Sequence, residues 1–247
     1  MNRKVAEYDH EAADYDETRF KNGMGRHLDY MHKKILESLI ISSGKLVLEA
    51  GVGTGRFATW LAKKGFRVIG IDISKEMLKK TKEKKELLNV DIGLILADVH
   101  FLPFRQGLFD GCICINVLDH VSSISKFFAE VRYSIKPEGF FVFNFSNLRS
   151  PYLPIAAIVN LRKRALFGSF QTSWFTLSEV DEWLSKDGFD IKRVNGCFIA
   201  SPLPLGNKLV KIIQAINYSV ENSRFKSFSG SLFIRAQLTN HIIHAVK

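Results

Sequence analysis

Short apolar runs alternate with amphipathic stretches along the chain. The runs are rich in Val, Ile, Leu and Phe and fall into seven strand-sized segments, whereas apolar residues between them recur at helical spacing. Strands that alternate with helices predict an α/β fold, a mostly parallel sheet with helices on both faces. We expect one antiparallel strand near the edge, formed by the last segment beside the fifth. The expected strands are 46–48, 66–71, 90–96, 109–116, 140–145, 189–194 and 230–238.

The first strand leads directly into a turn with three glycines at alternate positions. Glu49 ends the apolar run, Gly51, Gly53 and Gly55 follow, and a helical pattern begins after Arg56. Glycine allows a sharp turn and a close approach of a ligand to the backbone. Strand, glycine turn and helix together form the first unit of nucleotide-binding α/β folds. A tight turn without a ligand would also explain these glycines.

The residues around the glycines separate two kinds of ligand. A dinucleotide fingerprint requires Gly or Ala where this chain has Arg56, and Glu49 would add a like charge beside a pyrophosphate. Glu49 suits instead a ligand that carries an amine and a sulfonium. The segment Glu49-Ala-Gly-Val-Gly-Thr-Gly55 resembles motif I of the class I methyltransferases, E/D-x-G-x-G-x-G. This resemblance implies a Rossmann-like seven-stranded sheet and S-adenosylmethionine as the cofactor.

A carboxylate follows the second strand. Asp72 stands at the carboxyl end of this strand, where ligands bind in such folds, and it could accept both ribose hydroxyls of the cofactor. Either Asp72 or Ser74 could instead cap the next helix, and Ser74 is the better cap. Ile73 and Met77 are then placed to line the adenine, although Met77 could equally be a core residue.

The third and fourth strands also end in polar residues. Asp98-Val99, followed by Leu-Pro-Phe, resembles the family loop in which an acidic side chain binds the adenine amine; a turn aspartate is the alternative. Asn116 follows the fourth strand, where the transferred methyl should lie. The family frequently has a histidine at the position of His120, which implies a base or a substrate-orienting group; a structural histidine is the alternative. The sequence lacks the Asn/Asp-Pro-Pro-Tyr signature of amino-group methylation on adenine or glutamine.

Two segments outside this core also carry patterns that point to a role. Tyr8 and Tyr15 are seven residues apart, so a continuous helix would place them on one face. Their Tyr-Asp-x-x-Ala-x-x-Tyr-Asp pattern resembles the N-terminal lid of small-molecule methyltransferases, and a helix packed on the body is the alternative. A long helix is expected over 26–41. Residues 147–175 lie where the family inserts a substrate cap, and their aromatic residues suit an apolar or aromatic acceptor. Their basic triplet, Arg162-Lys163-Arg164, suits an anionic group or a membrane surface. An amphipathic helix that covers the sheet is the alternative to a cap.

Composition narrows the setting. The chain has 247 residues and is 46% hydrophobic, which fits one large domain. A net charge of +10 permits an anionic partner such as nucleic acid, although the lysines of 79–86 are interspersed with glutamates, as on a solvated helix face. The few cysteines and the lack of a signal peptide or bilayer-length apolar run favour a cytoplasmic protein. Cys112 and Cys114 fit core packing better than a metal site, and no metal is expected.

These observations predict one methyltransferase domain, 1–247. We divide it into an N-terminal helical lid (1–44), a cofactor-binding core (45–146), a substrate-cap insertion (147–175) and the remainder of the sheet (176–247). The predicted activity is in-line methyl transfer to a small-molecule acceptor, similar to enzymes of quinone and natural-product pathways. An RNA or protein methyltransferase and a non-catalytic S-adenosylmethionine-binding protein are the alternatives. The predicted catalytic residue is His120, and the predicted cofactor-binding residues are Glu49, Gly51, Gly53, Gly55, Asp72, Ile73, Met77, Asp98, Val99, Asn116, Tyr15 and Arg19.

Overall fold

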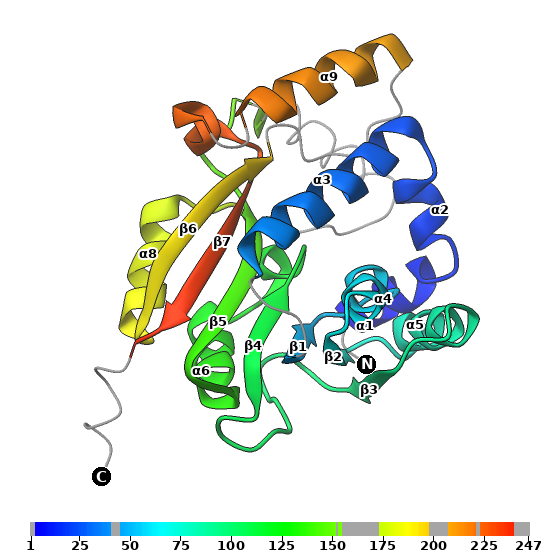
Figure 1. Ribbon diagram of the computed structural model, residues 1–247, viewed down its shortest axis with the longest axis vertical. Coiled ribbons are helices and arrows are strands. Elements are labelled where there is room, and N and C mark those ends of the chain that lie inside the picture. The colour runs from blue at the N-terminus through cyan, green and yellow to red at the C-terminus, as the bar shows by residue number, and fades with distance from the viewer. Residues whose placement is uncertain are drawn as a thin grey trace.

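A computed structural model describes residues 3–40, 45–151, 153–154, 173–197, 207–220 and 223–239. Within these ranges seven strands form one sheet in the order β3-β2-β1-β4-β5-β7-β6 (Figure 1). Strands β1 to β6 share one direction, and β7 runs antiparallel between β5 and β6. The predicted fold class is therefore confirmed. The strands are β1 Leu46–Ala50, β2 Arg67–Asp72, β3 Ile92–Leu96, β4 Phe109–Cys114, β5 Ile135–Ser146, β6 Phe189–Cys197 and β7 Ser231–Leu238.

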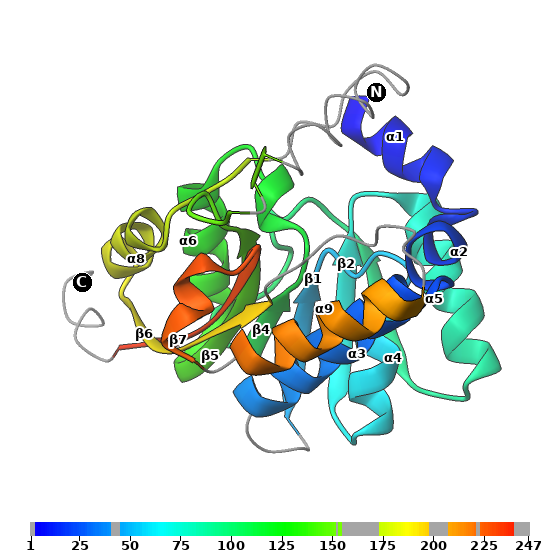
Figure 2. The same cartoon turned by 90° about the horizontal axis from the view of Figure 1, so that it is seen from above.

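Helices cover both faces of this sheet (Figure 2). Apolar side chains of α3, α4 and α9 form one core with the sheet, and those of α6 and α8 form the other. Helix α9 lies alongside α3 (Figures 1 and 2). The described helices are α1 Arg3–Glu11, α2 Tyr15–Phe20, α3 Gly23–Leu39, α4 Arg56–Lys63, α5 Lys75–Leu87, η1 Leu118–His120, α6 Ile124–Ser134, α8 Leu177–Lys186, α9 Asn207–Val220 and η2 Arg224–Phe228.

The central strands are apolar at consecutive positions because both faces are covered. In β5, Phe140 and Val142 belong to the core under α3 and α4, whereas Phe141 and Phe143 belong to the core under α6 and α8. The rings of Phe141 and Phe143 stack with their centroids 4.6 Å apart. This burial of alternate residues on opposite faces leaves the strand ends as the accessible part of the sheet.

Strand β5 begins earlier than the sequence indicates. The sequence predicts a strand from Phe140, after the turn-forming residues Lys136-Pro-Glu-Gly139, but β5 already starts at Ile135, which pairs with Phe109. The register shifts before the next pair, and Glu138 adopts a φ of +60°. A turn-forming sequence is thus accommodated as an irregularity within a strand, because the partner strand supplies hydrogen bonds on both sides of it.

The N-terminal segment is two helices and not one. The backbone N–H of Ala12 still bonds to the Tyr8 carbonyl at 3.0 Å, but Asp14 bonds three residues back, to Glu11, at 3.2 Å. Helix α2 then starts at Tyr15. The expectation that Tyr8 and Tyr15 share one face of a continuous helix is therefore wrong. Tertiary contacts override the local helical propensity of this stretch.

Other expectations are met or lie outside the described residues. The helix expected over 26–41 is α3, which begins earlier, where the Asn22 side chain accepts a hydrogen bond from Gly25 N at 2.7 Å. Residues 41–44 and most of the expected cap, 152 and 155–172 with the basic triplet, lie outside the described residues. Among those that are described, no helix is long and apolar enough to cross a bilayer.

Candidate functional site

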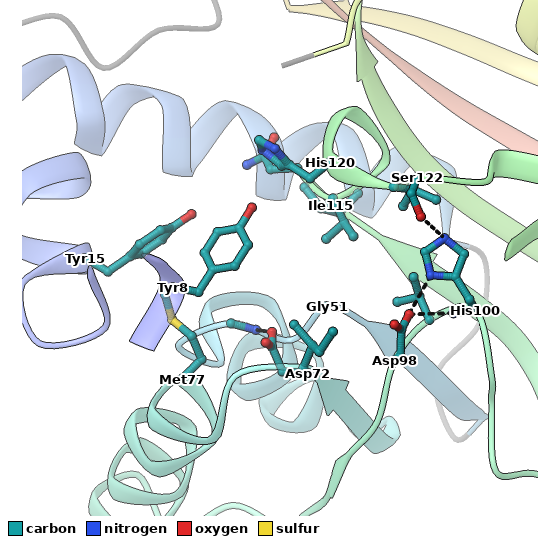
Figure 3. Close-up of a pocket in the computed structure, with 16 residues that line it drawn as sticks. Tyr8, Tyr15, Gly51, Asp72, Met77, Asp98, His100, Ile115, His120 and Ser122 are labelled. Atoms are coloured by element: carbon teal, nitrogen blue, oxygen red, sulfur yellow. Dashed lines mark hydrogen bonds and ion pairs between the residues drawn. The ribbon is translucent and has the colours of Figure 1, made fainter. Parts of the chain in front are cut away.

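A cavity of about 290 Å³ lies at the carboxyl ends of the central strands (Figure 3). It is bounded by the glycine turn after β1, by the loops that follow β2, β3 and β4, and by side chains from α1 and α2. Ligands bind at this edge of the sheet in parallel α/β folds. The lining residues are Tyr8, Tyr15, Gly51, Gly53, Asp72, Ile73, Met77, Asp98, Val99, His100, Ile115, Asn116, Val117, His120, Val121 and Ser122.

The three glycines of the turn have different surroundings. Gly51 has a φ of +76°, and a Cβ there would lie 2.3 Å from a methyl of Val117. Gly53 has a φ of +54°, and a Cβ there would meet no atom within 4 Å, so its backbone borders open space. Gly55 does not line the cavity, and a Cβ there would lie 2.6 Å from a methyl of Thr81 on α5. Gly51 and Gly53 therefore face the site, while Gly55 allows two helices to approach.

Asp72 fastens the glycine turn to the end of β2. Its Oδ2 accepts a hydrogen bond from Gly53 N at 2.8 Å, and its Oδ1 accepts one from Ser74 N at 2.9 Å. Ser74 caps α5, as expected, by accepting from Met77 N at 3.1 Å. Burial raises the pKa of Asp72. A carboxylate oxygen can accept more than one bond, so Asp72 keeps capacity for a ligand, and Ile73 and Met77 lie beside it in the cavity wall.

Glu49 is a buried carboxyl on β1 and does not itself line the cavity. It is 2% exposed, and its Oε2 has no hydrogen-bond partner among the described residues. Burial raises its pKa well above the usual range, nearby Arg56 lowers it in part, and Asp72 raises it further. A buried acceptor without a donor is costly. This oxygen therefore fits a ligand that brings a donor.

The loop after β3 contributes a histidine that the sequence analysis missed. Asp98 and Val99 line the cavity as expected, and Asp98 Oδ1 accepts a hydrogen bond from the His100 backbone N at 2.9 Å. The same oxygen lies 2.6 Å from His100 Nδ1 (Figure 3). His100 Nε2 lies 3.2 Å from both Ser122 Oγ and Ser123 N. The sequence did hold a signal for this contact. An aspartate in a loop commonly accepts a hydrogen bond from the backbone two residues further on, and His100 stands two residues after Asp98.

Asn116 adopts a left-handed conformation after β4, with a φ of +61°. Its backbone N donates to Asn144 Oδ1 at 2.6 Å, and its Oδ1 accepts from Asn144 Nδ2 at 2.9 Å. This reciprocal pair joins the turn to β5. The fourth strand therefore ends at Cys114 and not at Asn116, because a positive φ cannot continue an extended strand.

His120 lies at the end of η1 and lines the cavity. Its ring meets the ring of Tyr8 edge to face, with the centroids 6.0 Å apart (Figure 3). The neighbouring Asp119 accepts hydrogen bonds from Ser146 N at 2.9 Å and Ser146 Oγ at 2.6 Å. Burial raises the pKa of Asp119 to about 6. These bonds fix η1, and with it His120, to the end of β5.

Each cavity tyrosine is followed by an aspartate that binds the body of the protein. Asp9 Oδ1 accepts a hydrogen bond from Ser74 Oγ at 2.6 Å. Asp16 Oδ1 accepts one from Thr54 Oγ1 at 2.7 Å, and the same carboxylate pairs with Lys84. Both contacts end on the glycine turn or on α5 and its cap. The two Tyr-Asp pairs therefore hold α1 and α2 against the cavity rim.

Arg19 does not line the cavity. Its Nη2 lies 2.9 Å from Glu11 Oε2, and its guanidinium carbon lies 4.4 Å from the centroid of the Tyr15 ring. Arg19 thus braces α2 against α1 and supports the Tyr15 ring from behind the cavity wall. In the described ranges no group of three or more His, Cys, Asp and Glu side chains could hold a metal ion. Cys112 and Cys114 are buried in the core.

Comparisons with known proteins agree with this geometry. Residues 48–143, from β1 into β5, match the model of a methyltransferase domain family. A ubiquinone biosynthesis O-methyltransferase from Coxiella burnetii is 26% identical over 168 residues, which cover 66% of this chain and 71% of that protein.

Solved methyltransferases share the fold. A possible histamine N-methyltransferase from Thermotoga maritima superposes with a TM-score of 0.69 at 18% identity, over 93% of this chain and 97% of the other. The magnesium protoporphyrin IX methyltransferase from Synechocystis, solved with bound SAH (S-adenosylhomocysteine), superposes with a TM-score of 0.61 at 19% identity, over 87% of each chain. The family match spans the glycine turn, Asp72 and Asp98, and together with the O-methyltransferase relatives it supports a class I S-adenosylmethionine-dependent methyltransferase.

Proposed function

We propose that this methyltransferase acts on a small-molecule acceptor. The proposal rests on one observation: Tyr8 and Tyr15, from the N-terminal helices, line the same cavity as His120 (Figure 3). These helices cover the side of the cavity that His120 faces, which suits a compact acceptor, whereas a nucleic acid or a folded protein needs an open groove. Relatives named ubiquinone biosynthesis O-methyltransferase support an acceptor with a hydroxyl group on an aromatic ring.

The residues of the cavity fit the cofactor. The open space beside Gly53 admits a ligand against the backbone. Glu49 lies outside the cavity lining, but its buried Oε2 has no hydrogen-bond partner among the described residues and suits the amine of the ligand. We infer that Asp72 binds the ribose hydroxyls and that Asp98 binds the adenine amine. Arg19 and Gly55, which do not line the cavity, would act indirectly through Tyr15 and the packing of the turn. The proposed cofactor site is completed by Gly51, Ile73, Met77, Val99, Asn116 and Tyr15.

Bound S-adenosylmethionine supplies a methyl group that its sulfonium already activates. The chain must therefore hold the acceptor in line and exclude water, and such positioning accounts for several kcal/mol of a barrier. Tyr8 lines the cavity, and its phenol, whose pKa is raised by burial, is placed to donate a hydrogen bond to the methyl acceptor. We assign to His120 the orientation of the acceptor and the removal of its proton where the acceptor is a hydroxyl.

Methyl transfer from labelled cofactor tests this proposal. The purified protein is incubated separately with hydroxylated aromatic compounds, with cellular RNA and with cellular protein. We expect label in the small-molecule fraction. Label in the RNA or protein fraction contradicts the proposed acceptor class, and binding of the cofactor without transfer to any fraction indicates a non-catalytic binding protein.

The role of His120 is tested by substitution. His120→Ala is expected to lower turnover on the identified acceptor by about 10²-fold or more, the usual contribution of a general base. Its affinity for S-adenosylhomocysteine should stay near that of the wild type. Turnover that survives the substitution would remove His120 from the reaction.

A further inference from the structure

His100 connects two loops that line the cavity. Its Nδ1 contacts Asp98 Oδ1 in the loop after β3 (Figure 3). Its Nε2 contacts Ser123 N in the loop before α6. A backbone N–H can only donate, so Nε2 must offer a lone pair to Ser123. The proton of the neutral ring is therefore on Nδ1, and it is donated to Asp98 at 2.6 Å.

These contacts decide which oxygen of Asp98 can serve a ligand. The Asp98 side chain is 36% exposed, so its own packing leaves it room to rotate, whereas the His100 side chain is 14% exposed. Both hydrogen bonds from His100, through its backbone N and its Nδ1, end on Oδ1. Among the described residues no hydrogen bond reaches Oδ2. His100 thus orients the carboxylate and leaves one defined acceptor.

We propose that His100 is a positioning residue of the cofactor site, which holds Asp98 so that Oδ2 accepts the exocyclic amine of adenine. This inference rests on the proposed cofactor contacts. An acceptor that is fixed before binding loses little side-chain entropy when the ligand arrives. It also selects the base, because a purine with an oxo group in place of the amine has an acceptor where adenine has a donor, and this oxygen would face the carboxylate oxygen.

Three substitutions at one position separate the two contacts of the ring. Asn can place an amide N–H near the position of Nδ1 and so keep the bond to Asp98. Gln can place its amide oxygen near the position of Nε2 and so keep the bond to Ser123. Ala keeps neither side-chain contact. His100→Asn should bind S-adenosylhomocysteine within about threefold of the wild type in calorimetry, whereas His100→Gln and His100→Ala should bind about tenfold more weakly, the loss expected for a hydrogen bond to a charged group.

A second ligand distinguishes positioning from general support of the fold. S-inosylhomocysteine carries an oxo group where adenine carries the amine. The wild type should prefer S-adenosylhomocysteine, and His100→Ala should lower this preference about tenfold by weakening only the adenine ligand. In an Asp98→Ala background, His100→Ala should cause no further loss.

Several results would overturn the proposal. These are unchanged binding by His100→Ala, an equal loss for both ligands, and tighter binding by His100→Gln than by His100→Asn. Thermal unfolding of each variant verifies that it is folded, and the Asn–Gln comparison stands even where Ala fails to fold. The acceptor proposal fails separately: a wild type that selects adenine but methylates RNA leaves the role of His100 intact.

Discussion

At the scale of single residues, the site depends on a few backbone positions with strict requirements. Gly51 and Gly53 both have positive φ, but only Gly51 is enclosed, since a Cβ there would lie 2.3 Å from Val117. A Cβ on Gly53 would meet no atom within 4 Å. The same substitution at these two positions should therefore separate stability from ligand binding.

Gly51→Ala should lower the melting temperature markedly, because the new methyl clashes with Val117 in addition to the backbone strain. Gly53→Ala should lower the free energy of unfolding only by the strain of a left-handed alanine, about 1–2 kcal/mol. It should nevertheless abolish binding of S-adenosylhomocysteine, because the new methyl fills the space beside the turn. Thermal unfolding and calorimetry measure the two effects. Adding Val117→Ala to the Gly51→Ala variant should partly restore its melting temperature. The roles given to the two glycines are contradicted if Gly53→Ala binds S-adenosylhomocysteine as tightly as the wild type. They are also contradicted if Val117→Ala restores no stability to the Gly51→Ala variant.

Asp119 offers a second prediction, on pH. Its pKa is about 6 in the folded protein, against 3.8 for an ordinary aspartate, because burial disfavours the charge. The folded state holds this proton more tightly, so the contribution of Asp119 to the free energy of unfolding falls as pH rises from about 4 to 6. The shift corresponds to about 3 kcal/mol. Asp119→Asn does not titrate and can still accept a hydrogen bond from Ser146 N. The melting temperature of this variant, relative to that of the wild type, should therefore rise as the pH increases from about 4 to 6.

The control for this prediction is Asp190→Asn, because Asp190 is an exposed carboxylate on β6. Its melting temperature should follow that of the wild type through the same pH range. If Asp119→Asn also runs parallel to the wild type between pH 4 and 7, Asp119 is charged in the fold without penalty and the pKa assignment is wrong.

The sequence predicted those site residues whose signal is local. The glycines and Asp72 stand in a short strand-turn-helix pattern, and Ser74 caps the helix that the pattern requires. His100 was missed because its role depends on Ser123, more than 20 residues away, and on the direction of its ring. Arg19 was predicted to bind the cofactor, but it does not line the cavity, and its guanidinium lies over the ring of Tyr15, a contact that the sequence does not show.

At the scale of elements, two short helices close one side of the cavity, and each is held by an aspartate. Helix α1 is joined to the cap of α5 through Asp9, and α2 to the glycine turn through Asp16 and Thr54. The sequence predicted a covering segment but joined it into one helix, since the break at 12–14 contains neither Gly nor Pro. Asp9 and Asp16 lie on either side of this break, and each binds the body of the protein.

Loss of the α2 contact should speed the release of the cofactor. Asp16→Asn combined with Thr54→Val removes the hydrogen bond of 2.7 Å and weakens the pairing with Lys84. We expect the dissociation rate of S-adenosylhomocysteine in stopped-flow fluorescence to rise about five- to tenfold, equivalent to about 1–1.4 kcal/mol. Glu17→Gln is the matched control, because Glu17 lies on the same helix and pairs with the exposed Lys21. Equal rates in wild type and double variant would show that α2 does not retain the ligand.

At the scale of the whole molecule, the net charge of +10 is partly paired. On α5, Lys79 pairs with Glu76 at 2.6 Å and Lys80 with Glu83 at 3.2 Å, as expected for a solvated helix face. Exposed pairs of this kind contribute little to stability. The positive charge of this helix therefore gives no support to a nucleic-acid surface, and the cavity is the better guide to function.

Because the cavity is built from the ends of several strands and from both N-terminal helices, ligand binding should stabilise the fold as a unit. At 100 times its dissociation constant, S-adenosylhomocysteine should raise the free energy of unfolding by about 2.7 kcal/mol. For a chain of this length, that corresponds to an increase of about 5–10 °C in melting temperature.

NAD at the same concentration should give no increase in melting temperature, since Arg56 occupies a position that a dinucleotide fingerprint reserves for Gly or Ala. Asp72→Ala should reduce the increase sharply, because Asp72 both fastens Gly53 and lines the cavity. An increase with NAD and none with S-adenosylhomocysteine would contradict the assignment of the cavity, and an undiminished increase in Asp72→Ala would exclude Asp72 from the site.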